Sequence, residues 1–162
     1  MLARWIDAVR RNHGLEHATV AVLLARRGPV RLAGRASGDG FFMIGDLDDA
    51  LLLSCAREAL DRLQRGEAGL AISPLCGTNI AVTGAITAAA TMAVLRRSRD
   101  GRTRDRFGNA FTVAMLAVIV AQPLGRLVQR YLTTRADLEG VELVGVRSLF
   151  PGVRKVYTRA VP

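Results

Sequence analysis

Two uncharged stretches, from Ile80 to Leu95 and from Ala110 to Leu124, constrain the fold of this 162-residue chain most. Both are rich in apolar and small residues, and each is a few residues short of the roughly 20 that a helix needs to cross a bilayer. Flanking residues such as Thr78 and Leu127 can extend them. We therefore predict a hairpin of two apolar helices that spans a membrane. The alternative is a hairpin buried in the core of a soluble protein.

The composition and the distribution of charge favour the membrane. Half of the residues are apolar and only 5% are aromatic, a balance richer in small aliphatic residues than most soluble domains need. The net charge of +9 is concentrated in the loop from Arg96 to Arg106 and in the tail after Leu124, while the segment from Met1 to Gly77 is nearly neutral. Basic residues beside apolar helices are typical of anchors at a lipid surface. Peripheral binding to anionic lipid is an alternative, and nothing in the pattern predicts binding to nucleic acid.

The remaining segments predict an α+β fold. We expect helices over 2–26 and 46–63, and strands over 30–36, 41–45, 70–73, 141–149 and 153–161. Because two membrane crossings return the chain to its starting side, the last two strands can join the sheet begun by the first. The predicted fold is a small mixed sheet with two amphipathic helices, interrupted by the hairpin. It is a single domain, with an α/β half over 1–77, the hairpin over 78–132 and completing strands over 133–162.

The two histidines of the chain, His13 and His17, stand four positions apart, with Glu16 between them. On a helix both imidazoles share a face, so they can reach one zinc ion with the carboxylate beside them. His-x-x-Glu-His is the order found in inverted zinc peptidases. The trio falls on the predicted buried stripe of Leu2, Ile6, Val9, Val20 and Leu24, with Ala18 on the opposite side. A buried polar network, with Glu16 paired to an arginine such as Arg35, is the alternative interpretation.

A zinc site needs a third protein ligand, and Cys76 is the first candidate. It lies in a turn before an apolar helix, where the helix dipole favours the thiolate. Cys76 can equally be a small residue that packs the turn. Other candidate ligands are Asp39, Asp46 and Glu67. A different chemistry would make Cys76 a nucleophile with His17 as its base and Asn79 as the orienting group.

Several blocks of the sequence resemble an uncharacterised family of small bacterial membrane proteins, catalogued as a domain of unknown function. The blocks are Asn12-His13-Gly14-Leu15-Glu16-His17-Ala18-Thr19, Ala33-Gly34-Arg35, Gly40-Phe41-Phe42 with Gly45-Asp46, Cys76-Gly77-Thr78-Asn79 and Ala121-Gln122-Pro123-Leu124-Gly125. The resemblance implies a membrane location and the unity of the two halves, but no substrate or reaction. Relatives often carry histidine where this chain has Ser73, so one potential ligand is missing here.

The leading hypothesis is a membrane-anchored metallohydrolase, similar to a zinc peptidase. His13, His17 and Cys76 would bind zinc as the cofactor, and Glu16 would be the catalytic general base. The alternative is a non-catalytic membrane scaffold or complex subunit, in which the polar cluster has a structural role. The expected partners are the lipid bilayer and another protein or a second copy of the chain. Since the first residues do not resemble a signal peptide, we expect the α/β unit on the cytoplasmic side of the bacterial inner membrane.

Overall fold

The computed structural model describes residues 1–97 and 102–161, so part of the loop expected between Arg96 and Arg106 lies outside the described residues. The chain divides into two compact units. The first unit comprises residues 1–73 and 130–162, and the second comprises residues 74–129.

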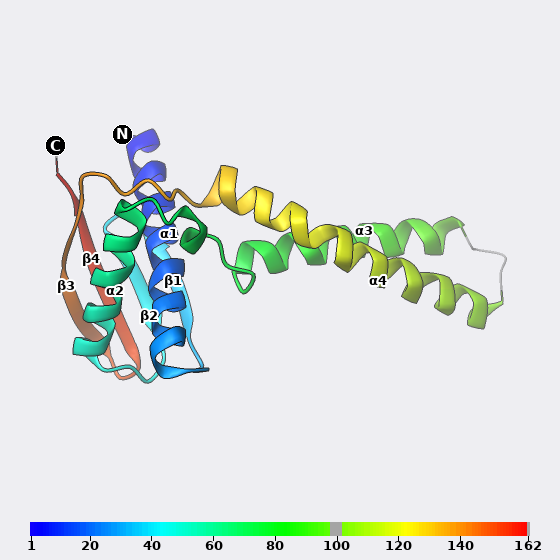
Figure 1. Ribbon diagram of the computed structural model, residues 1–162. Helices are drawn as coiled ribbons and strands as arrows, with labels where there is room; N and C mark the ends of the chain where they lie inside the picture. The colour runs from blue at the N-terminus through cyan, green and yellow to red at the C-terminus, as the bar shows by residue number, and fades with distance from the viewer. Residues whose placement is uncertain (98–101, 162) are drawn as a thin grey trace. The chain divides into compact units, whose positions relative to one another are not determined.

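The first unit is a sheet of four strands with two helices packed on one of its faces (Figure 1). Its elements, in chain order, are α1 (Leu2–Arg27), β1 (Ala33–Ser37), β2 (Gly40–Ile44), α2 (Asp49–Gln64), the short 3-10 helix η1 (Ala68–Ala71), β3 (Val141–Phe150) and β4 (Val153–Ala160). A π-helical turn, η2 (Gln129–Thr133), leads the chain back into this unit. The predicted α+β class is therefore confirmed.

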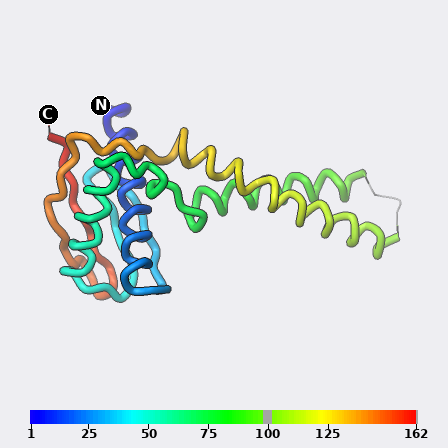
Figure 2. The backbone as a smooth tube through the Cα atoms, viewed as in Figure 1, coloured from blue at the N-terminus to red at the C-terminus, as the bar shows by residue number. Residues whose placement is uncertain are grey.

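The strands follow the spatial order β1-β2-β4-β3, and each pairing is antiparallel. The prediction of a mixed sheet is corrected in this respect. Strand β4 lies beside β2, with Gly40 opposite Tyr157 and Ile44 opposite Val153, although the two strands are more than a hundred residues apart in the chain (Figure 2). The carboxy-terminal strands thus complete the sheet that the amino-terminal segment begins.

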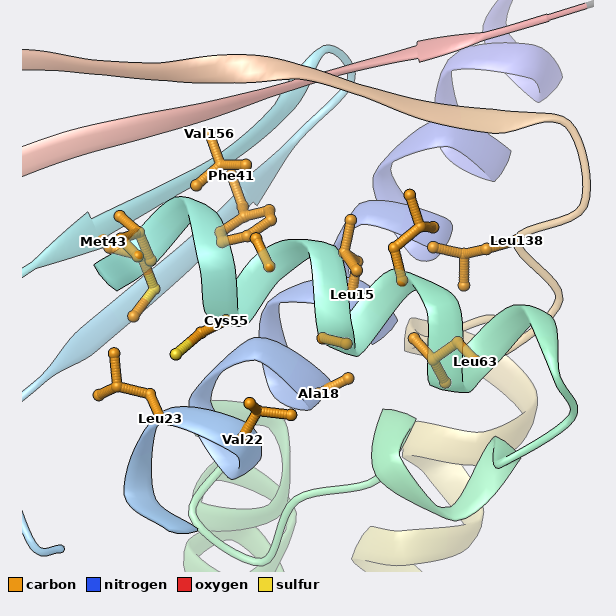
Figure 3. Close-up of a cluster of buried hydrophobic side chains, with 14 of the residues drawn as sticks. Leu15, Ala18, Val22, Leu23, Phe41, Met43, Cys55, Leu63, Leu138 and Val156 are labelled. Atoms are coloured by element: carbon orange, nitrogen blue, oxygen red, sulfur yellow. The ribbon is translucent and has the colours of Figure 1, made fainter. Parts of the chain in front are cut away.

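The core of the first unit lies between the two helices and the covered face of the sheet (Figure 3). Phe41 and Met43 of β2 point into it and are fully buried. Asp48 caps the amino-terminal end of α2, and its side chain accepts a hydrogen bond of 2.9 Å from the Leu51 amide, as the predicted acidic cap requires. The face of α2 that was predicted to be buried is buried, and its residues are Leu52, Ala56, Ala59, Leu60 and Leu63.

Two sequence predictions about this unit are wrong. Leu2 and Ile6 are exposed while Ala18 is fully buried, because the first buried residue of α1 is Asn12 and the helix packs through a face rotated from the predicted stripe. The segment predicted as a strand over 70–73 is not a strand, since Leu70 and Ala71 belong to the 3-10 helix η1, which ends at Ala71. A run of four apolar or small residues does not distinguish a strand from a helical turn.

The second unit is a hairpin of α3 (Gly77–Arg97) and α4 (Thr103–Val128). At 21 and 26 residues the helices exceed the predicted arms. Helix α3 also includes residues 77–79 and the two arginines at 96–97, and α4 also includes the charged residues at 104–106 and Arg126. Both are long and apolar enough to be candidate membrane spans. Within the most apolar windows only 6% and 17% of residues are buried, whereas the core helix of a soluble protein would be mostly buried.

Candidate metal centre

Helix α1 brings His13, Glu16 and His17 together on one side, as their spacing requires. The two imidazole rings lie 4.4 Å apart between centroids, and Nε2 of His13 lies 3.9 Å from Oε2 of Glu16. Glu16 and His17 are buried, with 7% and 5% of their surface exposed, and His13 is half-buried. Two imidazoles and one carboxylate therefore share a largely enclosed region of the first unit.

Each histidine is held through its Nδ1 atom by a backbone carbonyl. Nδ1 of His17 lies 2.8 Å from the Ala71 oxygen, and Nδ1 of His13 lies 2.9 Å from the Thr133 oxygen. A carbonyl oxygen can only accept, so Nδ1 carries the proton in both rings. In the neutral imidazole the lone pair then belongs to Nε2, the atom that a metal would use. Metal-binding histidines commonly show this arrangement, in which the second ring nitrogen donates to a carbonyl or carboxylate.

The two carbonyls belong to the segments through which the chain leaves the first unit and returns to it. Gly14 allows both segments to approach the helix. A Cβ atom at this position would lie 2.4 Å from the Arg135 oxygen and 3.2 Å from the Ala71 side chain. The glycine inside the His-Gly-Leu-Glu-His block is therefore explained by close packing beside the histidines.

Gly34 of β1 likewise makes room for a neighbouring group, in this case the side chain of Glu16. A Cβ atom on Gly34 would lie 2.0 Å from Oε1 of Glu16, so the carboxylate lies directly against the strand backbone. The suggested pairing of Glu16 with Arg35 is wrong, because neighbouring residues of a strand point to opposite faces. Gly34 is opposite the buried Met43, whereas Arg35 is exposed and opposite Phe42 on the other face.

Further polar side chains fix α1 at the level of the cluster. Asn12 is buried, donates to the Ser37 carbonyl at 2.8 Å and accepts from the Thr158 hydroxyl at 2.7 Å. It thereby links the helix to both β1 and β4. Sequence reasoning gave Asn12 no role, and its place beside His13 in a recognisable block was the available signal.

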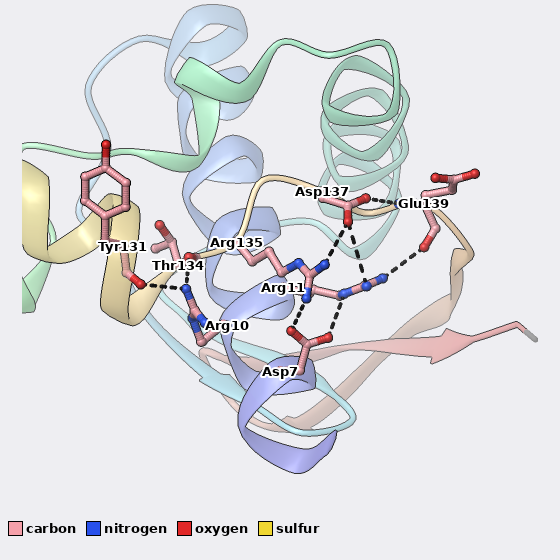
Figure 4. A network of polar contacts seen from close by, with 8 residues as sticks. All are labelled: Asp7, Arg10, Arg11, Tyr131, Thr134, Arg135, Asp137 and Glu139. Carbon is pink, nitrogen blue, oxygen red and sulfur yellow. Dashed lines mark hydrogen bonds and ion pairs between the residues drawn. The ribbon is translucent and has the colours of Figure 1, made fainter. Parts of the chain in front are cut away.

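A network of arginines and acids attaches the returning segment to α1 (Figure 4). Arg10 donates to the Tyr131 carbonyl at 2.8 Å, and Arg11 donates to the Glu139 carbonyl at 2.9 Å. Asp7 accepts from both Arg11 and Arg135. Burial acts to raise the pKa of Asp7, but the hydrogen bond and charge of Arg135, together with those of Arg11, outweigh it and lower the pKa. This network holds the segment that supplies the Thr133 carbonyl.

The acidic residues considered as third ligands have other partners or are exposed. Asp39 pairs with Lys155 at 2.6 Å, and this hydrogen bond lowers the pKa of the Asp39 carboxyl against the effect of burial. Glu67 accepts from Arg62, which likewise lowers the pKa of its carboxyl. Asp46 is exposed. None of the three is needed to explain the histidine cluster.

With these acidic residues set aside, the remaining candidate for the third ligand is the thiol of Cys76. Within the described ranges, His13, His17 and Cys76 are donors that could bind a metal ion. Cys76 belongs to the second unit and immediately precedes α3. The other cysteine, Cys55, is fully buried in the core of the first unit, and burial raises the pKa of its thiol.

The suggested arrangement of Cys76 as nucleophile with Asn79 orienting His17 is corrected by the hydrogen bonds. The group that holds Nδ1 of His17 is the Ala71 carbonyl. The amide of Asn79 donates instead within the second unit, to the Pro74 carbonyl at 3.0 Å and to Gln122 at 3.4 Å. Every residue has a backbone carbonyl, so the sequence does not indicate which carbonyl will contact a histidine. The contact of His17 with the Ala71 carbonyl could therefore not be predicted.

Comparison with known proteins places the chain in a family. A family model described as "Domain of unknown function (DUF6391)" matches residues 8–146, which include the blocks around His13 and Cys76. The chain belongs to this family. It is 40% identical over 140 residues to an uncharacterized protein of Picosynechococcus sp., an alignment that covers 80% of this chain and 67% of that protein. No solved structure matches the chain.

Proposed function

We propose that this protein is a membrane-anchored zinc protein of the hydrolase type. His13 and His17 bind the ion through Nε2, Cys76 is the third ligand, and Glu16 is the general base. The observation that carries the proposal is the pair of Nδ1 contacts to backbone carbonyls, which leaves the lone pair of each ring on Nε2. The centroids of the two rings lie 4.4 Å apart, so both Nε2 atoms could bind the same ion.

The donor set fits zinc. Imidazole nitrogen and thiolate sulfur are the ligands that zinc prefers, and three protein ligands leave a position open for chemistry. Cys76 follows Ala71 by five residues, so the covalent chain keeps their Cα atoms within about 18 Å of each other. Since the Ala71 carbonyl holds His17, this length of chain would allow Cys76 to reach an ion bound by the imidazoles.

In the proposed hydrolysis, the metal ion and Glu16 would have different roles. Bound zinc supplies Lewis acidity and lowers the pKa of a coordinated water. Glu16 would accept a proton at its carboxylate, which lies 3.9 Å from Nε2 of His13. The contact with Gly34 and the hydrogen bonds of Asn12 keep the carboxylate and the helix in place.

The second unit would be the membrane anchor. Its two helices expose apolar side chains along most of their length, and arginines lie at both ends of the hairpin, among them Arg96, Arg97, Arg102, Arg126 and Arg130. We place the first unit on the cytoplasmic side of the bacterial inner membrane.

A second candidate function is that of a non-catalytic membrane scaffold. The observation that favours it is the network around Arg11 and Arg135, together with the link from Asn12 to two strands. These contacts show that polar groups of α1 also hold the unit together. Under this interpretation the histidines would only join α1 to the two connecting segments.

Metal analysis of the protein purified in detergent tests the proposal. We expect one zinc ion per chain in the wild type and its loss in His17→Ala and Cys76→Ala. Cys55→Ala is the matched control, since Cys55 lies in the core of the first unit and should leave the zinc content unchanged. A wild-type protein that contains no metal and takes up no added zinc would contradict the proposal.

The variant Glu16→Gln separates the two candidate functions. If Glu16 is the base, the variant keeps its zinc and its stability but loses hydrolysis of a fluorogenic peptide library. If the cluster is structural, the same substitution mainly lowers the free energy of unfolding, by about 1 to 3 kcal/mol.

A further inference from the structure

The base of the hairpin contains a buried amide, the side chain of Asn79, which was suggested above to orient His17 and does not. Only 3% of the surface of Asn79 is exposed. Its Nδ2 atom donates to the Pro74 carbonyl and to Oε1 of Gln122, at 3.0 and 3.4 Å. Its Oδ1 atom is buried and accepts no hydrogen bond from the part of the chain that the structure describes. One side chain thus links the turn before α3 to helix α4.

Gly125 of α4 makes this link possible. A Cβ atom at Gly125 would lie 1.8 Å from Oδ1 of Asn79 and 3.2 Å from its Cα atom. The glycine is one of three small buried residues on α4, with Ala117 and Ala121, which let the two helices approach closely. The sequence blocks that end at Asn79 and at Gly125 therefore meet in space, and any side chain at Gly125 would displace the amide.

Two backbone carbonyls of the turn that contains Cys76 accept hydrogen bonds from α3. Two residues before Cys76, the Pro74 carbonyl accepts from Asn79, and at Cys76 itself the carbonyl accepts from the Ile80 amide at 3.2 Å. A carbonyl beside an apolar helix costs free energy unless it has a hydrogen-bond partner. The Asn79 amide meets this requirement at Pro74.

We propose that Asn79 is a positioning residue that holds the Cys76 turn, with Gly125 as the required close contact on α4. Asn79 acts through the backbone of residues 74–76 and not by touching the metal. This inference depends on the proposed function for the role of Cys76 as a ligand. The fixed conformation of the turn can be measured without any metal.

The first measurement uses the protein loaded with cobalt in place of zinc. We expect Gly125→Ala to weaken cobalt binding by about tenfold, the effect of losing about one buried hydrogen bond. The thiolate-to-cobalt charge-transfer absorption per bound ion should fall as well. Gly108→Ala is the matched control, because it makes the same change in the same helix at a position with no atoms within 4 Å of the new Cβ.

The second measurement uses metal-free protein with Cys55→Ala as background, so that Cys76 is the remaining thiol. Asn79→Asp keeps the shape of the side chain but removes the donor to the Pro74 carbonyl. We expect the rate at which iodoacetamide alkylates Cys76 to rise by about tenfold in this variant. The rate should stay at its starting value in the Gly108→Ala control.

The two measurements separate failure of the inference from failure of the proposed function. If the wild type binds no cobalt while Asn79→Asp still accelerates alkylation, the metal proposal fails and the positioning of the turn stands. If alkylation is as slow in Asn79→Asp and Gly125→Ala as in the control, the positioning role is overturned. Circular dichroism of each variant verifies that the helices are retained, and the two substitutions disturb the contact from opposite sides.

Discussion

The two units of the chain bury opposite kinds of residue. In the first unit the largest buried side chains are nearly all apolar, among them Phe41, Leu15 and Leu52, and the charged residues lie mostly on the surface. In the described part of the second unit the buried residues are small or polar, namely Cys76, Asn79, Ala117, Ala121, Gly125 and Gln129. Its large apolar residues, among them Phe107 and Ile119, are exposed.

This difference is the one expected if the first unit folds in water and the hairpin in lipid. In water the burial of large apolar surfaces drives folding, and the first unit follows that rule. In lipid there is no such drive between helices, so small residues and interhelical hydrogen bonds form the contact while the large apolar residues face outward. The contrast supports the proposed membrane location of the hairpin, and it indicates which substitutions each unit should tolerate.

The largest expected effect comes from the core of the first unit. Phe41→Ala should lower the free energy of unfolding by about 3 to 5 kcal/mol, because the side chain is fully buried and its removal leaves a cavity. Denaturation in detergent, followed by the fluorescence of the single tryptophan, Trp5, measures the loss. Phe111→Ala in the hairpin is the control and should change the value by no more than about 0.5 kcal/mol, since Phe111 is 59% exposed. Equal losses in both variants would contradict the contrast between the units.

A somewhat smaller effect tests the solvent of the hairpin directly. Ile119 in α4 and Val144 in β3 are each 64% exposed. An arginine near the middle of a membrane helix costs about 2.5 to 3.5 kcal/mol, so Ile119→Arg should reduce the fraction of protein inserted in the membrane. Val144→Arg should be tolerated, because the same charge at a surface facing water costs little.

Membrane fractionation with a carbonate wash measures insertion for both variants. If Ile119→Arg inserts as well as the wild type, α4 does not face lipid. The hairpin would then be a water-exposed or buried segment, and the proposed anchor would be lost.

Hydrophobic patterns and turn residues predicted most of the helices and strands. The features that they did not predict depend on how these elements pack together. The glycine-containing turn before β2 and the acidic cap at Asp48 are local signals, and they were sufficient to predict those elements. The rotated face of α1 was not predictable, because the burial of Ala18 depends on where α2 and the sheet meet the helix. The turn at Ala71 was misassigned for the same reason.

The candidate centre was predictable only in its side chains. The spacing of His13, Glu16 and His17 places them on one side of a helix, and the structure gathers them there. The carbonyls of Ala71 and Thr133 that orient the rings carry no sequence signal. Gly14 and Gly34 stood inside recognisable blocks, but the atoms they make room for come from distant segments and were invisible to pattern analysis.

The smallest expected effect is a loss of stability at low pH, which should affect the first unit and not the hairpin. The pKa of the Asp7 carboxyl is lowered from its ordinary value of 3.8, because Arg135 and Arg11 outweigh the effect of burial. A carboxyl whose pKa is lower in the folded state stabilises that state above its unfolded pKa, and the contribution is lost as the pH falls through the folded pKa. The denaturation midpoint of the first unit should therefore fall below about pH 4. Asp137 and Asp39 carry shifts of the same sign and should add to this fall.

Asp7→Asn should lower the midpoint at pH 7 and make its fall below pH 4 shallower than in the wild type. Asp61→Asn is the control, since its carboxylate is 71% exposed and has only a long contact of 3.6 Å with Arg65. In the described part of the second unit Asp105 is the single acidic residue, so the helical content of the hairpin should stay constant over the same range. If the hairpin and the first unit lose structure together in acid, the carboxylates of the first unit are not the cause. The same result would mean that the two units do not respond separately to their surroundings.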